Sequence, residues 1–188
     1  IVAVSAIFFY LASVVVPLFL PPGIENQARF ASPGEASQTT AAFTAEEQRE
    51  IGVRIGDQGA ISFFAFGTGA LLAETPLALP EGVRVTSFSK GDESTYVAAF
   101  GLSDGRAVVA KFGFEVTFPD GKRNIRPLIE YPLGEAPVQI DTQGKALVRL
   151  AVQQSDAGST LAAVTEDGRL LLSAVVTSTN RMTGEAKS

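Results

Sequence analysis

The sequence predicts a mainly β protein with one transmembrane helix at its N-terminus. Three observations favour this fold class. The first 20 residues form an apolar run without any charge, apolar residues alternate with others from Ile51 onward, and Asp-Gly turns recur between apolar stretches. A length of 188 residues suits one domain behind such a helix, because domains of about 100–200 residues are typical.

The apolar run covers residues 1–20 and reads IVAVSAIFFYLASVVVPLFL, in which only Ser5, Ser13 and Pro17 lie outside the apolar class. A helix of that length rises about 30 Å, the thickness of the hydrocarbon core of a bilayer. The run is too long for a buried strand or for the apolar part of a signal peptide. We therefore expect a transmembrane helix here, with Pro17 able to kink it. Because no Met precedes Ile1, we also expect the chain to be a fragment.

The rest of the chain divides into a linker over residues 21–43 and a β-domain over residues 44–188. The linker is rich in Pro, Gly, Ser, Ala and Thr and has no clear periodicity. At its end, Thr44-Ala45-Glu46-Glu47 has the spacing of a capping box. Two interpretations stay open for this stretch, a short helix that runs through Glu50 or an irregular lead-in to a strand.

The β-domain is predicted from hairpins that repeat along the chain. Apolar residues alternate over 51–55, residues 56–59 form a turn, and the chain returns as a strand. Similar units of strand, Asp-Gly turn and strand surround residues 103–106 and 166–169. Weaker copies of the turn lie at 119–122, between 112–118 and 125–131, and at 141–145, between 138–140 and 146–152. Strand-like runs also hold six predicted core aromatics, Phe63, Phe64, Phe66, Phe112, Phe114 and Phe118.

The spacing of these turns indicates a repeat of propeller type. Asp57 and Asp104 are 47 residues apart, and Asp104 and Asp167 are 63 residues apart, against about 40–50 residues in one blade. The chain offers two or three blades, whereas a complete propeller needs at least about four. We therefore predict an antiparallel β-hairpin repeat domain that is either propeller-like, and then incomplete in these residues, or a sandwich.

The composition excludes several classes of chemistry. The chain has no His and no Cys, which excludes imidazole catalysis, thiol nucleophiles, disulfides and zinc bound by Cys or His. The formal net charge of −5 argues against a general nucleic-acid binder. All charged side chains follow residue 20, and the first of them, Glu25, Arg29 and Glu35, are not predominantly basic. This flank favours an external position for residues 21–188.

The remaining candidate reactive groups are carboxylates, hydroxyls and lysines. Asp57, Asp104, Asp120 and Asp167 could form a calcium or acid–base site, but Gly follows each within two residues, so turn chemistry is the favoured interpretation. The segment Gly67-Thr68-Gly69 lacks the Lys-Ser/Thr of a phosphate-binding loop. We predict no catalytic, cofactor-binding or metal-binding residues, and no enzymatic activity.

Lys122, Arg123 and Arg126 form one basic cluster against the acidic trend. Five basic and two acidic residues lie between Arg106 and Arg126. Guanidinium groups suit phosphate, so a contact with an anion or a lipid headgroup is one interpretation. The favoured interpretation is a solvated hairpin tip with ordinary surface charge.

The apolar run and the hairpin repeats together resemble a known family. The run ends in FFYLASVVVPLF at residues 8–19, and the repeats read VAAFGLSDGRAVVAKFGFEVTF at 97–118 and TLAAVTEDGRLLLSAV at 160–175. These segments resemble the N-terminal part of large proteobacterial PstC-type phosphate ABC transporter permeases, which have a first membrane helix followed by a long periplasmic insertion. The resemblance covers most of the chain, but it includes no catalytic signature and transfers no functional residue.

The resemblance implies an accessory, non-catalytic periplasmic domain of a phosphate permease in the bacterial inner membrane. The implied partners are membrane lipid around residues 1–20, other transporter subunits and a periplasmic phosphate-binding protein, with no cofactor and no nucleic acid. An alternative interpretation is a membrane-tethered, propeller-like scaffold of the cell envelope that binds another protein. A hydrolytic β-domain with paired carboxylates is a third interpretation, which carboxylates on separate hairpins disfavour.

Overall fold

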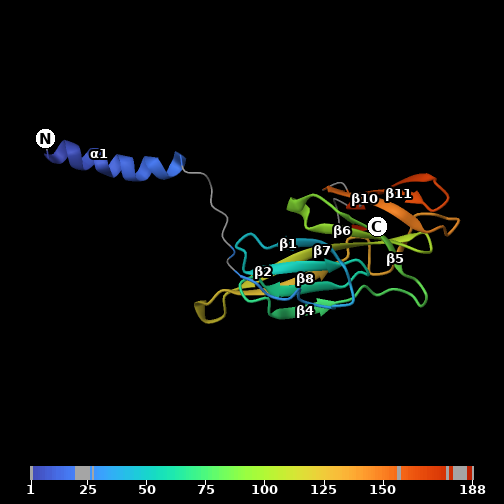
Figure 1. The fold of residues 1–188 in the computed structure, drawn as a ribbon. Coiled ribbons are helices and arrows are strands. Elements are labelled where there is room, and N and C mark those ends of the chain that lie inside the picture. The colour runs from blue at the N-terminus through green and yellow to red at the C-terminus, as the bar shows by residue number, and fades with distance from the viewer. Residues whose placement is uncertain are drawn as a thin grey trace.

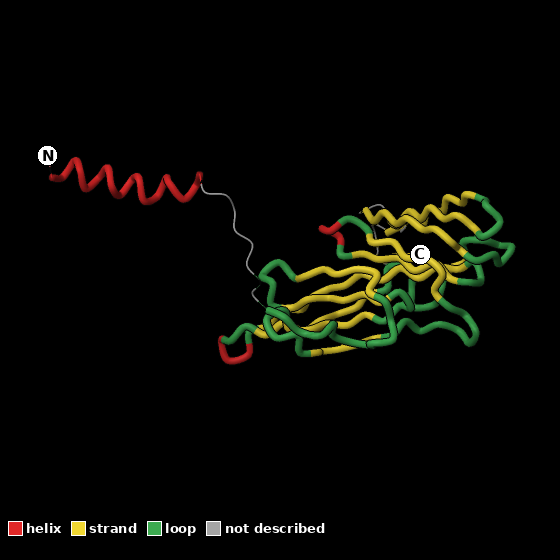
Figure 2. The backbone as a smooth tube through the Cα atoms, viewed as in Figure 1, coloured by secondary structure: helices red, strands yellow, loops and turns green. Residues whose placement is uncertain are grey.

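The protein is mainly β, with one short helix at its N-terminus (Figure 1). This computed structural model describes residues 2–19, 26, 28–155, 158–176, 178–179 and 186–187. The helix α1 covers Val2–Val15, and a 3₁₀ turn, η1, covers Val16–Phe19. Figure 2 shows that most of the remaining described chain is strand joined by turns, and the sheets are antiparallel, as the sequence predicts.

Three antiparallel sheets form the β-body, and each is a meander in which strands that follow one another in sequence also pair. Sheet A contains β1 (Thr40–Ala45), β2 (Ile51–Gly56), β3 (Ile61–Ala65) and β4 (Leu71–Thr75). Sheet B contains β5 (Val85–Lys90), β6 (Val97–Leu102), β7 (Arg106–Thr117) and β8 (Asn124–Glu130), with β9 (Val138–Gln139) beside the start of β7. Sheet C contains β10 (Leu147–Ser155), β11 (Gly158–Thr165) and β12 (Leu170–Val176).

Short elements complete the described chain. The 3₁₀ turns η2 (Glu93–Thr95) and η3 (Pro119–Gly121) connect strands of sheet B. The two-residue strands β13 (Ser178–Thr179) and β14 (Ala186–Lys187) pair with each other.

Sheet B is the middle layer of the core because both of its faces are apolar. Successive side chains of a strand point to opposite faces, so β6 and β7 each supply one set of apolar side chains to each face of the sheet. One set packs with sheet A and consists of Ala98, Phe100, Leu102, Val108, Ala110 and Phe112. The other packs with sheet C and consists of Val97, Ala99, Ala107 and Val109. The layers therefore follow the order A, B, C, which is one layer more than a sandwich has.

The three strong turn motifs of the sequence occupy equivalent places in the three sheets. Each joins the second strand of its sheet to the third, at residues 56–59, 103–106 and 166–169. Gly59, Gly105 and Gly168 have φ angles of 90°, 80° and 84°, in the left-handed region that glycine adopts most easily. The hairpins predicted at these three turns are thus confirmed, and the motif at 119–122 also lies in a hairpin, between β7 and β8.

The motif at residues 141–145 is not a hairpin turn, contrary to the prediction. Strand β9 pairs with β7, whereas β10 pairs with β11, so the runs on either side of this motif belong to different sheets. Residues 141–145 instead lead from sheet B to sheet C. Asp and Gly favour a turn whatever the flanking strands pair with, so the local sequence does not separate the two cases.

The start of sheet A also differs from the expected boundary, because β1 begins at Thr40, inside the range predicted as linker. The capping-box residues form no helix. Residues 46–50 make the tight turn between β1 and β2, in which the amide of Glu46 donates to the carbonyl of Ile51 at 2.9 Å. The Glu46 carboxylate accepts from the amide of Gln48 at 3.0 Å. Pairing of the flanking strands therefore outweighs the local preference for a helix.

The chain before β1 covers the outer face of sheet A, and we call residues 30–38 the N-terminal strap. Arg54 of β2 is only 3% exposed and donates to three carbonyl oxygens of the strap, those of Pro33, Glu35 and Gln38. Phe30 packs edge-on against Phe64, with ring centroids 5.9 Å apart. One face of sheet A thus packs on sheet B, and the strap covers part of the other face, where Phe43 and Leu71 stay about half exposed.

The predicted aromatic core is confirmed in part. Phe63, Phe64 and Phe112 are buried, and Phe114 packs partly buried against the core. Phe66 and Phe118 do not belong to it, with exposed fractions of 42% and 65%. Each of these two follows the last residue of its strand, where the alternation of the sheet no longer directs the side chain inward.

The helix is shorter than the predicted membrane span over residues 1–20, whose two terminal residues lie outside the described part of the chain. It ends at Val15, because Pro17 has no amide hydrogen and disfavours helical geometry at Val16, so the backbone tightens into η1. A helix of 14 residues rises about 21 Å, less than the roughly 30 Å of a hydrocarbon core. None of the helices within the described residues has the length and apolarity of a membrane span.

A substitution at Gly101 tests how tightly sheets B and C pack. A methyl group at this position would lie 2.2 Å from Ser87 Oγ and 3.0 Å from Leu147 Cβ. We predict that Gly101→Ala lowers the free energy of unfolding by about 1–3 kcal/mol, because neighbouring core atoms must move. Urea denaturation measures the change. Gly67→Ala is the matched control, since nothing lies within 4 Å of its added methyl group. Equal stability of the two variants would contradict the close packing.

Candidate functional site

The four aspartates singled out in the sequence lie in turns, and three of them bond to groups in or beside the turn. Asp57 accepts from the amide of Thr39 at 3.1 Å, Asp104 accepts from Arg106 Nε at 2.7 Å, and Asp167 accepts from Arg169 Nε at 2.9 Å. Asp120 lies in η3 with a φ of 53°. Within the described residues, no group of three or more acidic side chains is placed to hold a metal ion.

The fold directs the three side chains of the basic cluster, Lys122, Arg123 and Arg126, to different surroundings. Arg123 turns toward sheet A, where its guanidinium contacts Glu46 Oε1 at 2.9 Å and Glu50 Oε1 at 2.6 Å. Arg126 is exposed on β8 opposite Glu115 of β7, and Lys122 is exposed at the hairpin tip. One of the two guanidinium groups of the cluster, that of Arg123, therefore already has two carboxylate partners, which favours a structural role for it.

The segment Gly67-Thr68-Gly69 is the turn between β3 and β4. The Thr68 hydroxyl accepts from the amide of Ala70 at 3.3 Å, and Gly69 has a φ of 73°. A side chain at Gly69 would collide with the ring of Phe30, with only 2.4 Å between the added carbon and the ring. This glycine is therefore required by turn geometry and by the strap.

The contact between Asp141 and Arg169 is a buried polar site with many hydrogen bonds, and the sequence did not reveal it. The Asp141 side chain is 1% exposed, and each of its oxygens receives a bond of 2.9 Å from one terminal nitrogen of Arg169. The amides of Gln143 and Lys145 also donate to this carboxylate, at 3.2 Å and 2.8 Å. The Arg169 bonds, with help from these amides, lower the pKa of Asp141 to about 2.

This contact fixes the junction between sheets B and C. The amides of Ile140 and Asp141 donate to the carbonyl oxygen of Gly105, at 3.1 Å and 2.8 Å, so the connecting loop sits on the turn between β6 and β7. Arg169 belongs to the turn between β11 and β12. The amide-binding geometry of Asp141 follows from its Asp-Thr-Gln-Gly-Lys sequence, but nothing local indicates a partner 28 residues away.

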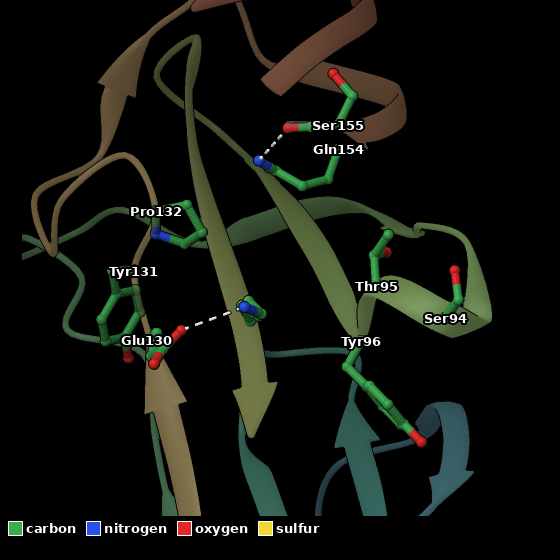
Figure 3. A pocket seen from close by; sticks show the side chains of 9 residues that line it. Ser94, Thr95, Tyr96, Glu130, Tyr131, Pro132, Gln154 and Ser155 are labelled. Carbon is green, nitrogen blue, oxygen red and sulfur yellow. Dashed lines mark hydrogen bonds and ion pairs between the residues drawn. The ribbon is translucent and has the colours of Figure 1, made fainter. Parts of the chain in front are cut away.

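A pocket of about 620 Å³ opens beside this stack and is the largest concave candidate for ligand binding among the pockets described (Figure 3). Its lining comes from both sheet B and sheet C and consists of Ser94, Thr95, Tyr96, Lys111, Glu130, Tyr131, Pro132, Gln154 and Ser155. Lys111 Nζ and Glu130 Oε2 lie 3.5 Å apart on paired strands, and both side chains are about half exposed. The pocket could not be predicted from the sequence, because its lining residues come from four separate segments of the chain.

The pocket is suited to hydrogen bonding rather than to proton transfer by its tyrosines. Burial raises the pKa of Tyr131, with a smaller contribution from the charge of Glu135. Burial likewise raises the pKa of Tyr96, followed by the charges of three nearby glutamates. Both phenols therefore stay protonated at neutral pH and can donate or accept hydrogen bonds. Tyr96 has a φ of 52°, an uncommon conformation for a bulky residue.

No protein-family model matches the chain, and no curated protein matches it.

The low pKa of Asp141 predicts an acid-sensitive junction. A carboxyl whose pKa falls from 3.8 to about 2 on folding stabilises the native state above pH 4, and this contribution is lost as the pH falls toward 2. We predict that Asp141→Asn lowers the melting temperature by several degrees at pH 7, and that its difference from the wild type shrinks between pH 4 and pH 2. Thermal unfolding followed by circular dichroism measures both. Glu81→Gln, at an exposed site, is the control. A difference that stays constant down to pH 2 would contradict the assigned contact.

Proposed function

We propose that residues 1–20 anchor the chain in a lipid bilayer and that the β-body is a non-catalytic accessory domain of a PstC-type phosphate permease, on the periplasmic side of the bacterial inner membrane. The observation that carries the anchor is the surface of α1. Its side chains are apolar on all sides and exposed, as Phe8 and Phe9 illustrate with exposed fractions of 67% and 71%. A helix that is apolar all round requires a lipid or protein environment.

The polar chemistry of α1 also supports insertion into lipid. No charged side chain occurs in residues 1–20, and the Ser13 hydroxyl donates to the carbonyl of Tyr10 at 2.7 Å. Such an internal bond meets the requirement that polar groups find partners within the helix when water is absent. Anchoring requires that α1 inserts into the bilayer and keeps the chain there. It does not require that α1 alone crosses the hydrocarbon core.

The layout of the sheets in the β-body supports the proposal that this domain is propeller-like. Its three meander sheets stack in chain order, and their principal turns occupy equivalent places. Stacked meander sheets of this kind are the building units of propellers, whose usual role is to present surfaces to other molecules. The permease itself is proposed from the resemblance of the segments at residues 8–19, 97–118 and 160–175.

A membrane-tethered scaffold that binds another envelope protein is the second candidate function. The pocket between sheets B and C favours it, because that pocket presents two tyrosines, Tyr96 and Tyr131, and tyrosine is enriched at protein interfaces. Both candidates share the anchor and differ in whether phosphate transport depends on the domain.

Vesicle flotation tests the anchor. We predict that the 188-residue chain floats with vesicles of phosphatidylethanolamine and phosphatidylglycerol, in low and high salt alike, because its net charge of −5 gives no attraction to anionic lipid. Phe8→Asp with Phe9→Asp should abolish flotation, since each carboxylate costs about 3 kcal/mol within a bilayer. Lys122→Asp, at an exposed site of the β-body, is the control and should float. Flotation of the double variant, or sedimentation of the wild type, would refute the anchor.

Phosphate uptake tests the permease. We predict that cells whose natural gene lacks the codons for residues 44–188 take up radiolabelled phosphate more slowly, or recover less of the assembled transporter, than cells with the intact gene. Immunoblotting of the membrane fraction controls for expression. Unchanged uptake together with unchanged assembly would remove the permease role and leave the scaffold as the remaining candidate.

A further inference from the structure

A cluster of phenylalanines lies on the outer face of sheet A, around the buried ring of Phe64. The rings of Phe30, Phe43 and Phe66 surround it, with their centroids 5.9, 6.3 and 6.4 Å from its own. Leu71 pairs with Phe64 across β3 and β4. We call these five residues the aromatic patch. The four around Phe64 have exposed fractions of 42% to 53%, and such a gathering of apolar side chains indicates a surface that meets more than water.

Two glycines make room for the rings of the aromatic patch. A methyl group on Gly52 of β2 would lie 2.4 Å from the ring of Phe64, and one on Gly69 would lie equally close to the ring of Phe30. The rings therefore rest directly against the backbone, which glycine permits because it has no side chain. Because the fold already holds these rings in place, the patch loses little conformational entropy when it meets another surface.

The chemistry of the aromatic patch favours lipid over a folded protein as the surface that it meets. None of its five side chains carries a group that can form a hydrogen bond. Protein interfaces combine apolar contacts with hydrogen bonds, whereas Phe and Leu are the residues that enter the boundary between headgroups and acyl chains. A fluid bilayer makes no directional demand on the patch, so its lack of polar groups is no disadvantage there.

The aromatic patch is also close in the chain to the proposed anchor. Phe30 belongs to the patch, and only residues 20–29 separate it from Phe19, where η1 ends. A chain of that length reaches at most about 40 Å when fully extended. Insertion of the anchor would therefore keep the bilayer near the patch, and a weak apolar contact then becomes an intramolecular event with a high effective concentration.

We propose that the aromatic patch is a second membrane contact, which inserts into the surface of the bilayer that holds residues 1–20. Because the layers follow the order A, B, C, this contact turns sheet A toward the lipid and sheet C away from it. The inference rests on the proposed anchor and deepens it, and it is independent of the phosphate assignment.

Tryptophan fluorescence tests the contact, because the chain contains no Trp and each variant therefore carries a single reporter. Phe43→Trp reports on the aromatic patch, and Phe8→Trp reports on the anchor. Leu172→Trp is the matched control, since Leu172 is also apolar, is 75% exposed and lies on sheet C at the opposite end of the stack. Each variant of the 188-residue chain is reconstituted with vesicles of phosphatidylethanolamine and phosphatidylglycerol, with and without lipid that is brominated near the top of its acyl chain. Bromine quenches the emission of a tryptophan that touches it.

We expect brominated lipid to lower the emission of Phe43→Trp and of Phe8→Trp by about twofold, and to leave that of Leu172→Trp unchanged. Quenching of Phe8→Trp without quenching of Phe43→Trp would overturn the patch contact and leave the anchor intact. Absence of quenching in both would refute the anchor and the contact together. Equal quenching of Phe43→Trp and Leu172→Trp would also overturn the proposal, because the β-body would then touch lipid without a preferred face.

A charge within the aromatic patch separates lipid insertion from other causes of quenching. Phe66→Asp, at a position that is 42% exposed, should restore the emission of the Phe43→Trp reporter, because a carboxylate resists entry into lipid. The same change should leave Phe8→Trp quenched, and circular dichroism checks that the β-body stays folded. Quenching of Phe43→Trp that persists beside Phe66→Asp would contradict the contact. A dimer in sedimentation velocity that Phe66→Asp abolishes would assign the patch to a second copy and overturn the proposal.

Discussion

The two-sided burial of sheet B is the constraint on which the rest of the structure depends. Every residue of β6 is buried, so neither of its faces tolerates water, and two other sheets must be present for this strand to be stable. The alternation of the strand divides its side chains into one set for sheet A and one for sheet C. Folding of the β-body is therefore expected to be cooperative across all three layers, since removal of either outer sheet exposes a complete apolar face of the middle one.

Directional polar contacts fix how the layers are placed on one another, which apolar packing alone leaves loosely defined. The pair of Asp141 and Arg169 joins the connecting loop to the turn of sheet C, and Arg123 joins the hairpin of sheet B to the first turn of sheet A. Burial of a carboxylate is costly unless all its bonds are satisfied, and Asp141 meets that condition with bonds from a guanidinium and two amides. Such satisfied networks favour one arrangement of the sheets over close alternatives.

The sequence predicted features that depend on neighbouring residues and missed those that depend on distant ones. Strand alternation and Asp-Gly turns are local, so the three equivalent hairpins and the buried Phe63 and Phe112 were predictable. The end of α1 at Val15 follows from Pro17 and was foreseen only as a kink within a longer helix. The role of Asp141, the strap held by Arg54 and the pocket arise from residues far apart in the chain, and a single sequence carries no signal for those pairings.

The N-terminal strap also gives the stack a polarity. The chain enters at sheet A and occupies the outer side of that sheet with its own backbone, held there by a guanidinium that is almost fully enclosed. That end of the stack is therefore partly covered by the segment that follows the apolar helix in the chain. The outer side of sheet C has no such strap among the described residues and exposes Leu170 and Leu172, so the two ends of the stack present different surfaces.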